Sequence, residues 1–370
     1  MNKRLVHTPE GVRDIYGDEK AAKNIVEQLL QDKIKSYGYR DIQTPTFEFF
    51  DVFSKEVGTT PSKELYKFFD KEGNTLVLRP DFTPSIARCA AKYFMDENVP
   101  IRFSYRGNTF INTSDLQGKL KEVTQMGAEL IGDASIYADA EMIAMTIESL
   151  YHAGLSDFQI SLGNLEYFKG ICAEAGLNEE TELELRELIS GKNYFGAEEL
   201  LEGIHAGRRE KELLLKVSEL FGTSAILEEA KREVSNKRSK NAVERLEKVY
   251  QVLCEYGVEK YVSFDLGMLS KYNYYTGIIF KGYTYGVGDA IVKGGRYDNL
   301  LHRFGKDAPA IGFVIVVDDL LAAMNRQGAV ISGIESCQKL SYTEETFREM
   351  LLEAKRMRAA GKSVELLPEI

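Results

Sequence analysis

The sequence predicts an α+β fold in which one mostly antiparallel β-sheet is flanked by helices. Strand-like segments occur before residue 165, and they return after residue 260 in runs such as YVSFDLGML and AIGFVIVV. Between them, about residues 165–257 have a helical, charge-rich pattern with no convincing strand. Strands on both sides of a helical stretch indicate a single sheet that an inserted helical subdomain interrupts in sequence.

The N-terminal part is predicted to begin with a helix and to continue with strands. Residues 19–36 place their apolar side chains on one face of a helix, and Gly38 follows as a stop signal. A strand-like stretch then leads into the phenylalanine-rich residues 43–53. Two hairpin-like segments come next: YKFFDKEGNTLVLRP, with a turn at residues 72–74, and PIRFSYRGNTFI at residues 100–111.

The middle of the chain carries the clearest amphipathic helix. It is predicted over residues 135–153 and is ended by Gly154, after which DFQISLGN has the pattern of a strand. Beyond the helical insertion, strands are expected in residues 261–269, in residues 274–297 and in the AIGFVIVV segment. These segments complete the predicted sheet.

The last residues are predicted to form a small separate element. After a loop near residues 326–340, a capping pattern at Ser341 and Glu344 predicts a helix over 343–360, and SVELL resembles a strand. One helix and one strand cannot bury a core alone, so this tail is expected to pack on the main body or on a partner. The predicted division is therefore a core domain at 1–325 and a short remnant at 326–370.

Composition limits the function classes. The chain has 47 basic and 57 acidic residues, a net charge of −10, which argues against a role dominated by contacts with nucleic-acid phosphates. Its four cysteines lie far apart without the close pair that a zinc site needs, so we expect free thiols and no metal. No apolar run approaches the length of a membrane span, and the start has no apolar signal region. We expect a cytoplasmic protein without a membrane anchor.

Six segments that occur in order over roughly residues 5–325 resemble parts of class II aminoacyl-tRNA synthetases, and histidyl-tRNA synthetase in particular. They are TPTFE at 44–48, LRPDFTPSIAR at 78–88, QMGAEL at 125–130, NYYTGIIF at 273–280, GGRYDNLL at 294–301 and PAIGFVIVVDDL at 309–320. The resemblance implies a class II synthetase-like antiparallel sheet. It also implies homodimerisation, because the first segment is similar to the motif that forms the dimer interface.

The same segments predict a small polar pocket of amino-acid size. Two carboxylates suit an ammonium or imidazolium group, two neutral side chains can form hydrogen bonds, and two tyrosines can stack on a ring. By resemblance this is a histidine-binding site, and its predicted residues are Asp81, Thr83, Gln125, Glu129, Tyr274 and Tyr275.

Each of these residues also has a purely structural interpretation. Asp81 precedes a predicted helix and could cap it. Glu129 could face solvent from a strand. If residues 274–275 form a strand, their side chains point to opposite faces and only one lines the pocket. The glycines at 286, 288, 294 and 295 could be turns or bulges. The co-occurrence of four distant segments that all resemble one pocket favours the binding interpretation.

Three departures from the synthetase pattern predict that the chain makes no aminoacyl-adenylate. Adenylation needs cations for the charge that develops on the phosphates. Ile111 stands at one expected arginine position, Ser270 at a second, and Asp319 at a third. Lys271 is adjacent to Ser270 but would point to the opposite face of a strand. Only about 35 to 45 residues follow the last motif, where the synthetases carry a full anticodon-binding domain, so no tRNA partner is expected.

With synthetase-like segments, a predicted amino-acid pocket and no adenylation arginines, the chain resembles the regulatory subunits of ATP phosphoribosyltransferase. The resemblance implies a non-catalytic, allosteric protein of histidine biosynthesis, without a cofactor, that activates a short-form catalytic subunit. It implies a hetero-octamer of four plus four subunits and feedback inhibition by L-histidine. Whether histidine would bind in the synthetase-like pocket or at the subunit interface stays open. The alternatives are a pseudo-synthetase that binds another ligand and an atypical histidyl-tRNA synthetase.

Overall fold

The computed structural model describes most of the chain in two compact units. The described residues are 6–53, 60–97, 99–113, 119–204, 207–270, 274–333 and 337–369. The first unit comprises Met1–Asp14 and Val26–Ala329, and the second comprises Ile15–Ile25 and Val330–Ile370. Helix α1, Gly17–Ser36, has residues in both units and ends before Gly38, whose positive φ of 82° terminates it as predicted.

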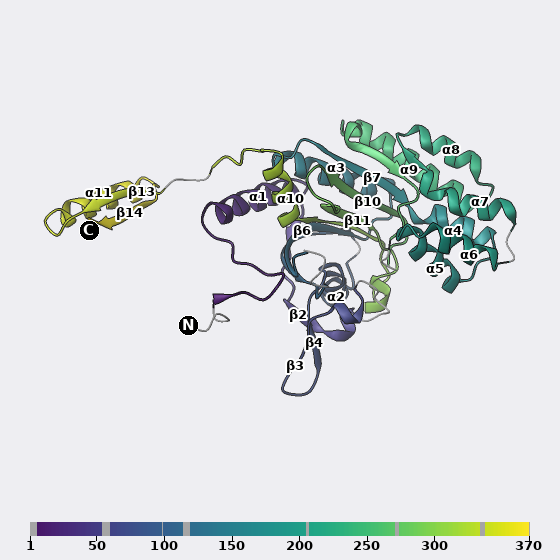
Figure 1. Ribbon diagram of the computed structural model, residues 1–370, viewed down its shortest axis with the longest axis horizontal. Helices are drawn as coiled ribbons and strands as arrows, with labels where there is room; N and C mark the ends of the chain where they lie inside the picture. The colour runs from purple at the N-terminus through teal and green to yellow at the C-terminus, as the bar shows by residue number, and fades with distance from the viewer. Residues whose placement is uncertain are drawn as a thin grey trace. The chain divides into compact units, whose positions relative to one another are not determined.

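One large, mostly antiparallel sheet forms the centre of the first unit, as the sequence predicts (Figure 1). Within the described residues it has nine strands in the order β1-β5-β6-β12-β11-β10-β7-β9-β8. The strands are β1 Arg40–Asp41, β5 Ile101–Phe110, β6 Glu122–Ile131, β7 Phe158–Asn164, β8 Phe221–Gly222, β9 Val262–Asp265, β10 Ile278–Thr284, β11 Val292–Arg296 and β12 Ala310–Val316. The pairs β1–β5 and β7–β9 are parallel and the other neighbours are antiparallel.

Strand β5 corrects one prediction. Residues 100–111 do not form a hairpin, because ten residues pair continuously with β6 from Ile101 opposite Ile131 to Phe110 opposite Glu122. Gly107 does not form a turn. Its missing side chain leaves room for Arg79. A Cβ atom there would lie 2.5 Å from the Nη2 atom of Arg79. The glycine therefore serves close packing within a straight strand.

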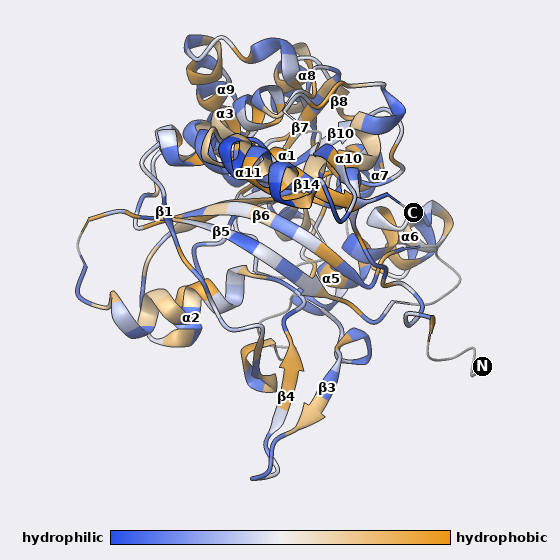
Figure 2. Ribbon diagram, turned by 90° about the vertical axis from the view of Figure 1, so that its left-hand side faces the viewer, coloured by the Kyte–Doolittle hydropathy of each residue, from blue (hydrophilic) through white to orange (hydrophobic). Residues whose placement is uncertain are grey.

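Helices cover both faces of the central strands. Helix α3, Ile136–His152, and helix α10, Val317–Arg326, pack on β6 and β12, while α2, Thr83–Tyr93, lies on the opposite side (Figures 1 and 2). Helix α3 confirms the predicted 135–153 segment. Its cap is Ser135, whose hydroxyl oxygen accepts a hydrogen bond from the backbone N–H of Ala138 at 3.2 Å.

A small three-stranded sheet beside α2 confirms the other predicted hairpin. Its strands, in the order β2-β4-β3, are β2 Phe47–Phe49, β4 Thr75–Leu78 and β3 Lys67–Phe69. At the turn, Asp70 accepts hydrogen bonds from the backbone N–H groups of Glu72 and Asn74, and Gly73 has a φ of 86°. Short 3₁₀ helices flank these strands at η2 Phe50–Phe53 and η3 Ser62–Glu64.

The segment after β7 is mainly helical. Its helices are α4 Leu165–Glu174, α5 Glu179–Ser190, α6 Tyr194–Glu202, α7 Arg208–Lys216, α8 Ala225–Glu233 and α9 Lys237–Glu255. The expectation that it contains no strand is wrong. The two residues of β8 pair with β9, and so short a strand leaves no alternating pattern to detect. Further 3₁₀ helices are η5 Val217–Glu219, η6 Glu259–Tyr261 and, later in the chain, η7 Leu301–Phe304.

The end of the chain contains a β-α-β element. Strands β13, Gln338–Tyr342, and β14, Val364–Pro368, are parallel neighbours joined through helix α11, Phe347–Ala359. The predicted cap at Ser341 is wrong, since Ser341 lies within β13 and the helix begins six residues later. The predicted SVELL strand is confirmed as β14. None of the helices that the structure describes is long and apolar enough to cross a membrane.

Candidate amino-acid pocket

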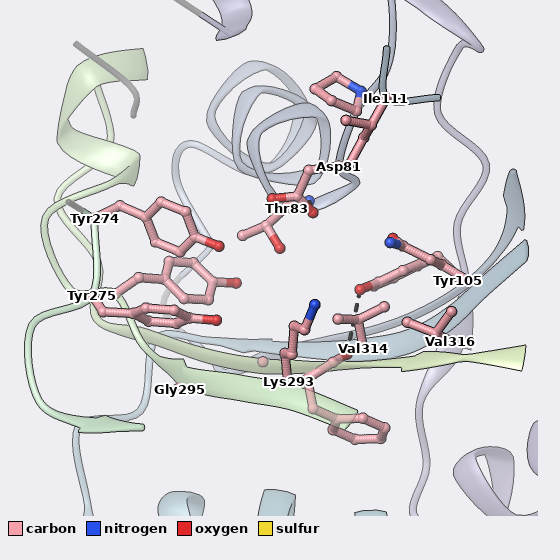
Figure 3. Close-up of a pocket in the computed structure, with 15 residues that line it drawn as sticks. Asp81, Thr83, Tyr105, Ile111, Tyr274, Tyr275, Lys293, Gly295, Val314 and Val316 are labelled. Atoms are coloured by element: carbon pink, nitrogen blue, oxygen red, sulfur yellow. Dashed lines mark hydrogen bonds between the residues drawn. The ribbon is translucent and has the colours of Figure 1, made fainter. Parts of the chain in front are cut away.

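One cavity lies between the start of α2 and the central strands of the large sheet. The space between its walls is about 610 Å³, part of which is open to solvent. Residues of β5, β6, β11 and β12 form its floor and sides, and the turn before β10 closes one end (Figure 3). Five of the six predicted site residues line it, namely Asp81, Thr83, Gln125, Tyr274 and Tyr275.

Asp81 lines the cavity and also contacts the first turn of α2, although the N-cap position of that helix is Phe82. Asp81 precedes α2, and its Oδ1 atom accepts a hydrogen bond from the backbone N–H of Thr83 at 3.3 Å. Burial raises the pKa of Asp81, while hydrogen bonds from the backbone N–H groups of Thr83 and Phe82, the charge of Lys293 and a hydrogen bond with Tyr274 act in the opposite direction. Its hydrogen bonds hold the carboxyl group in one orientation, and no described cation forms an ion pair with it. This arrangement suits a ligand with a cationic group.

Glu129 lies behind the cavity wall and does not line it. It is 1% exposed on β6, which excludes the solvent-facing interpretation. Its two carboxyl oxygens accept hydrogen bonds from the hydroxyl groups of Thr83, at 2.8 Å, and Tyr297, at 2.5 Å, and both of these residues line the cavity. Burial raises the pKa of Glu129 to about 8. On the adjacent strand, Gly312 leaves the room that this carboxyl group occupies, because a Cβ atom there would collide with it.

The two tyrosines correct another prediction. Tyr274 and Tyr275 lie in a turn before β10 and not in a strand, so alternation does not separate them. Both line the cavity, with their ring centroids 4.7 Å apart (Figure 3). Gly295 makes this arrangement possible, because a Cβ atom there would lie 2.8 Å from the ring of Tyr275. The two rings, tilted by 48° to each other, give the cavity an aromatic wall with two hydroxyl groups.

Gln125 supplies an open hydrogen-bonding position. It lies on β6 and lines the cavity. Its Oε1 atom is buried and has no hydrogen-bond partner among the residues that the structure describes. A buried acceptor without a partner is uncommon in proteins and points to a donor that the bound ligand provides.

The predicted departures from the synthetase pattern are divided between the cavity and its surroundings. Ile111 lines the cavity as an apolar side chain, whereas Ser270 is buried outside the lining. Asp319 lies in the first turn of α10, also outside it. Burial and the neighbouring Asp289 raise the pKa of Asp319, and this carboxyl group therefore shares its environment with another acid. Lys271 lies outside the described residues.

Three polar residues of the cavity are not among the predicted site residues: Tyr105, Lys293 and Tyr297. Tyr297 belongs to the GGRYDNLL segment, so its proximity to the predicted residues was a usable signal. Lys293 directly precedes that segment, and only its two-residue spacing from Gly295 on β11 indicates that the two face the same side. Across the described ranges, no group of three or more His, Cys, Asp or Glu side chains is arranged to hold a metal ion.

Comparisons with known proteins agree with the fold and show the family. A family model described as histidyl-tRNA synthetase matches residues 11–320. An ATP phosphoribosyltransferase regulatory subunit from Ruminiclostridium cellulolyticum is 42% identical over 366 residues, which cover 99% of this chain and 87% of the relative. A crystal structure of an ATP phosphoribosyltransferase regulatory subunit/histidyl-tRNA synthetase from Bacillus halodurans C is 34% identical with a TM-score of 0.88, covering 98% of this chain and 93% of the other.

A histidyl-tRNA synthetase from Nostoc sp. is 20% identical, with a TM-score of 0.80 over 99% of this chain and 86% of that chain, and it supports the fold alone.

Proposed function

Since this chain belongs to the family of ATP phosphoribosyltransferase regulatory subunits, we propose that it is the non-catalytic subunit of such an enzyme. In this role it activates a short-form catalytic subunit and contributes to feedback inhibition by histidine. The catalytic partner condenses ATP with phosphoribosyl pyrophosphate, the first step of histidine biosynthesis. The chain itself works in the cytoplasm, without a cofactor.

One observation carries the proposal: the amino-acid end of the cavity is equipped for binding, while the nucleotide end lacks the expected arginines. Ile111 contributes no charge to the lining, and Asp319 introduces a negative charge next to Asp289. At about 4 Å and an effective dielectric constant near 20, each unit charge contributes on the order of 4 kcal/mol. Replacing a cation by an anion therefore opposes binding of a triphosphate strongly, which supports a protein without adenylation chemistry.

The cavity suits histidine better than it suits a nucleotide. The carboxylate of Asp81 and the unpartnered Oε1 atom of Gln125 can accept hydrogen bonds from an α-ammonium group. The rings of Tyr274 and Tyr275 can contact an imidazole, and their hydroxyl groups can bind its nitrogen atoms. We therefore place the effector in this pocket rather than at the subunit interface. Glu129 would act by holding Thr83 and Tyr297 in position.

Regulation through this pocket needs only a difference in histidine affinity between two quaternary states. Such coupling free energies are typically ~1–3 kcal/mol. The proposed assembly is a hetero-octamer of four copies of each subunit, within which this chain forms homodimers. The small sheet supports the dimer, because Phe47, Phe49 and Phe69 expose more than half of their surface there. Figure 2 shows the apolar colouring of β3 and β4 on this projecting hairpin.

Co-purification with a short-form catalytic subunit tests the proposal. Tagged full-length chain should retain that subunit, and Phe49→Asp, at the exposed small sheet, should reduce homodimer formation. As a control, a long-form phosphoribosyltransferase with its own regulatory domain should not be retained. If the short-form subunit is also not retained, the assignment is wrong.

A second assay addresses one of the two alternatives, an atypical histidyl-tRNA synthetase, because the matching family model carries that description. The chain should show no histidine-dependent exchange between ATP and pyrophosphate. An authentic histidyl-tRNA synthetase run in parallel provides the positive control. Measurable exchange would mean that the chain is an enzyme in its own right.

A further inference from the structure

Lys293 places a positive charge inside the cavity. It lies on β11, and its side chain rises from the sheet into the cavity on the side where Asp81 lies (Figure 3). None of the described residues forms an ion pair or a hydrogen bond with its ammonium group. Among the described residues that line the cavity, Lys293 is the one with a positive charge. A half-buried ammonium group without a partner suits an anionic ligand group.

The surrounding acids leave Lys293 available. Asp289 is paired with Lys119, with 2.9 Å between Nζ and Oδ2. Asp81 is held by the backbone N–H of Thr83. Asp319 lies close enough to feel the charge of Lys293 but makes no ion pair with it. The three acids exert an attraction on Lys293 without neutralising it by direct contact.

The charges of the cavity match one class of ligand. An α-amino acid carries an ammonium group and a carboxylate group on the same carbon atom, so its recognition needs an anion and a cation in one small space. Asp81 and the open Oε1 atom of Gln125 supply the first, and Lys293 supplies the second. Hydrogen bonds in which a partner is charged are stronger than those between neutral groups, so these contacts can supply much of the binding free energy.

We infer that Lys293 binds the carboxylate group of the amino acid whose ammonium group is held by Asp81 and Gln125, and that it thereby determines specificity for a free carboxylate. This inference rests on the proposed histidine-binding function. A single carboxylate is favoured over a phosphate, because Asp289 and Asp319 repel each added negative charge. Analogues of histidine that lack the carboxylate should therefore bind poorly.

Titration calorimetry on the full-length chain tests this assignment, first by comparing two ligands and then by comparing variants of Lys293. L-histidine should bind the wild type, and L-histidinol, which carries an alcohol in place of the carboxylate, should bind roughly 10- to 100-fold more weakly. In Lys293→Gln the affinity for histidine should fall to that for histidinol, while the affinity for histidinol stays unchanged. Lys293→Arg, which keeps the charge, should retain most of the affinity for histidine.

Lys281→Gln provides a matched control. Lys281 lies directly opposite Lys293 on β10, so this variant makes the same change of charge one strand away but outside the cavity lining. It should bind histidine as the wild type does. If the wild type binds histidine and histidinol equally, or Lys293→Gln keeps full affinity, the role of Lys293 is refuted while the histidine site stands. If the wild type does not bind histidine, the proposed function and the inference both fail.

Discussion

At the scale of single residues, Glu129 links protonation to folding. Its pKa is about 8 in the folded protein, against an ordinary value of 4.5, because burial disfavours its charged form. Between these two values the folded protein keeps a proton that the unfolded chain releases. The contribution of Glu129 to the unfolding free energy is therefore complete below pH 4.5, and it is lost as the pH rises through about 8.

Glu129→Gln should remove this dependence. Between about pH 5 and about pH 9, the unfolding free energy of the wild type should fall relative to that of the variant by on the order of a few kcal/mol. Urea unfolding of both proteins at the two pH values measures the difference. Glu184→Gln, which changes an exposed side chain, is the control and should follow the wild type. Parallel pH profiles for wild type and Glu129→Gln would show that this carboxyl group does not carry the linkage.

The sequence predicts five residues of the pocket but not all of their roles. Asp81, Thr83 and Gln125 were identified because their segments resemble a known pocket, and they line the cavity. The arrangement of Tyr274 and Tyr275 was predicted wrongly, because the alternation rule holds only inside a strand and these residues precede β10. Lys293 was missed because its meaning depends on which charges face it across the fold, and one sequence does not reveal that.

At the scale of secondary-structure elements, a buried ionic cluster connects the helical insertion to the sheet. Asp139 of α3 is fully buried and accepts hydrogen bonds from Arg296 of β11, at 2.8 and 2.6 Å, and from Arg245 of α9, at 2.7 Å. Arg296 directly precedes the cavity residue Tyr297. The cluster thus holds the insertion, α3 and one wall of the pocket in a fixed arrangement.

Asp139→Ala should destabilise the protein severely. It removes the closer acidic partner of the 3% exposed Arg296, which then keeps only the part-buried Asp298 at 3.1 Å, and breaking a buried pair typically costs about 3–5 kcal/mol. Glu212→Ala is the control, since it breaks an exposed pair with Arg208 within α7 and should cost less than about 1 kcal/mol. Denaturant unfolding measures both. Equal losses in the two variants would contradict a structural role for the cluster.

The long elements were predictable and the short ones were not. Helix α3 and strand β7 follow from apolar periodicity that extends over several turns or residues. Strand β8 has two residues, and its existence depends on pairing with β9. At the end of the chain, Ser341 has the composition of a helix cap, but pairing between β13 and β14 places it in a strand. The structure of these short segments depends on pairing with strands elsewhere in the chain, which local sequence does not reveal.

At the scale of the whole molecule, the chain combines a synthetase-like fold with a cavity that we propose binds an amino acid. The fold and the family are established by the 42% identical relative and by the structure with a TM-score of 0.88. The net charge of −10 gives no support for tRNA binding. A sensor that changes the activity of a partner needs a ligand site and an interface, and it needs no chemistry of its own.

The most direct test of this account is the rate at which a short-form catalytic subunit forms phosphoribosyl-ATP as the chain is titrated into the assay. The account predicts that the rate rises until the two subunits are equimolar, and that added histidine then lowers it. Lys281→Gln should behave like the wild type, whereas Lys293→Gln should still activate but respond to histidine only at higher concentrations. A rate that does not change when the chain is added would contradict the central claim.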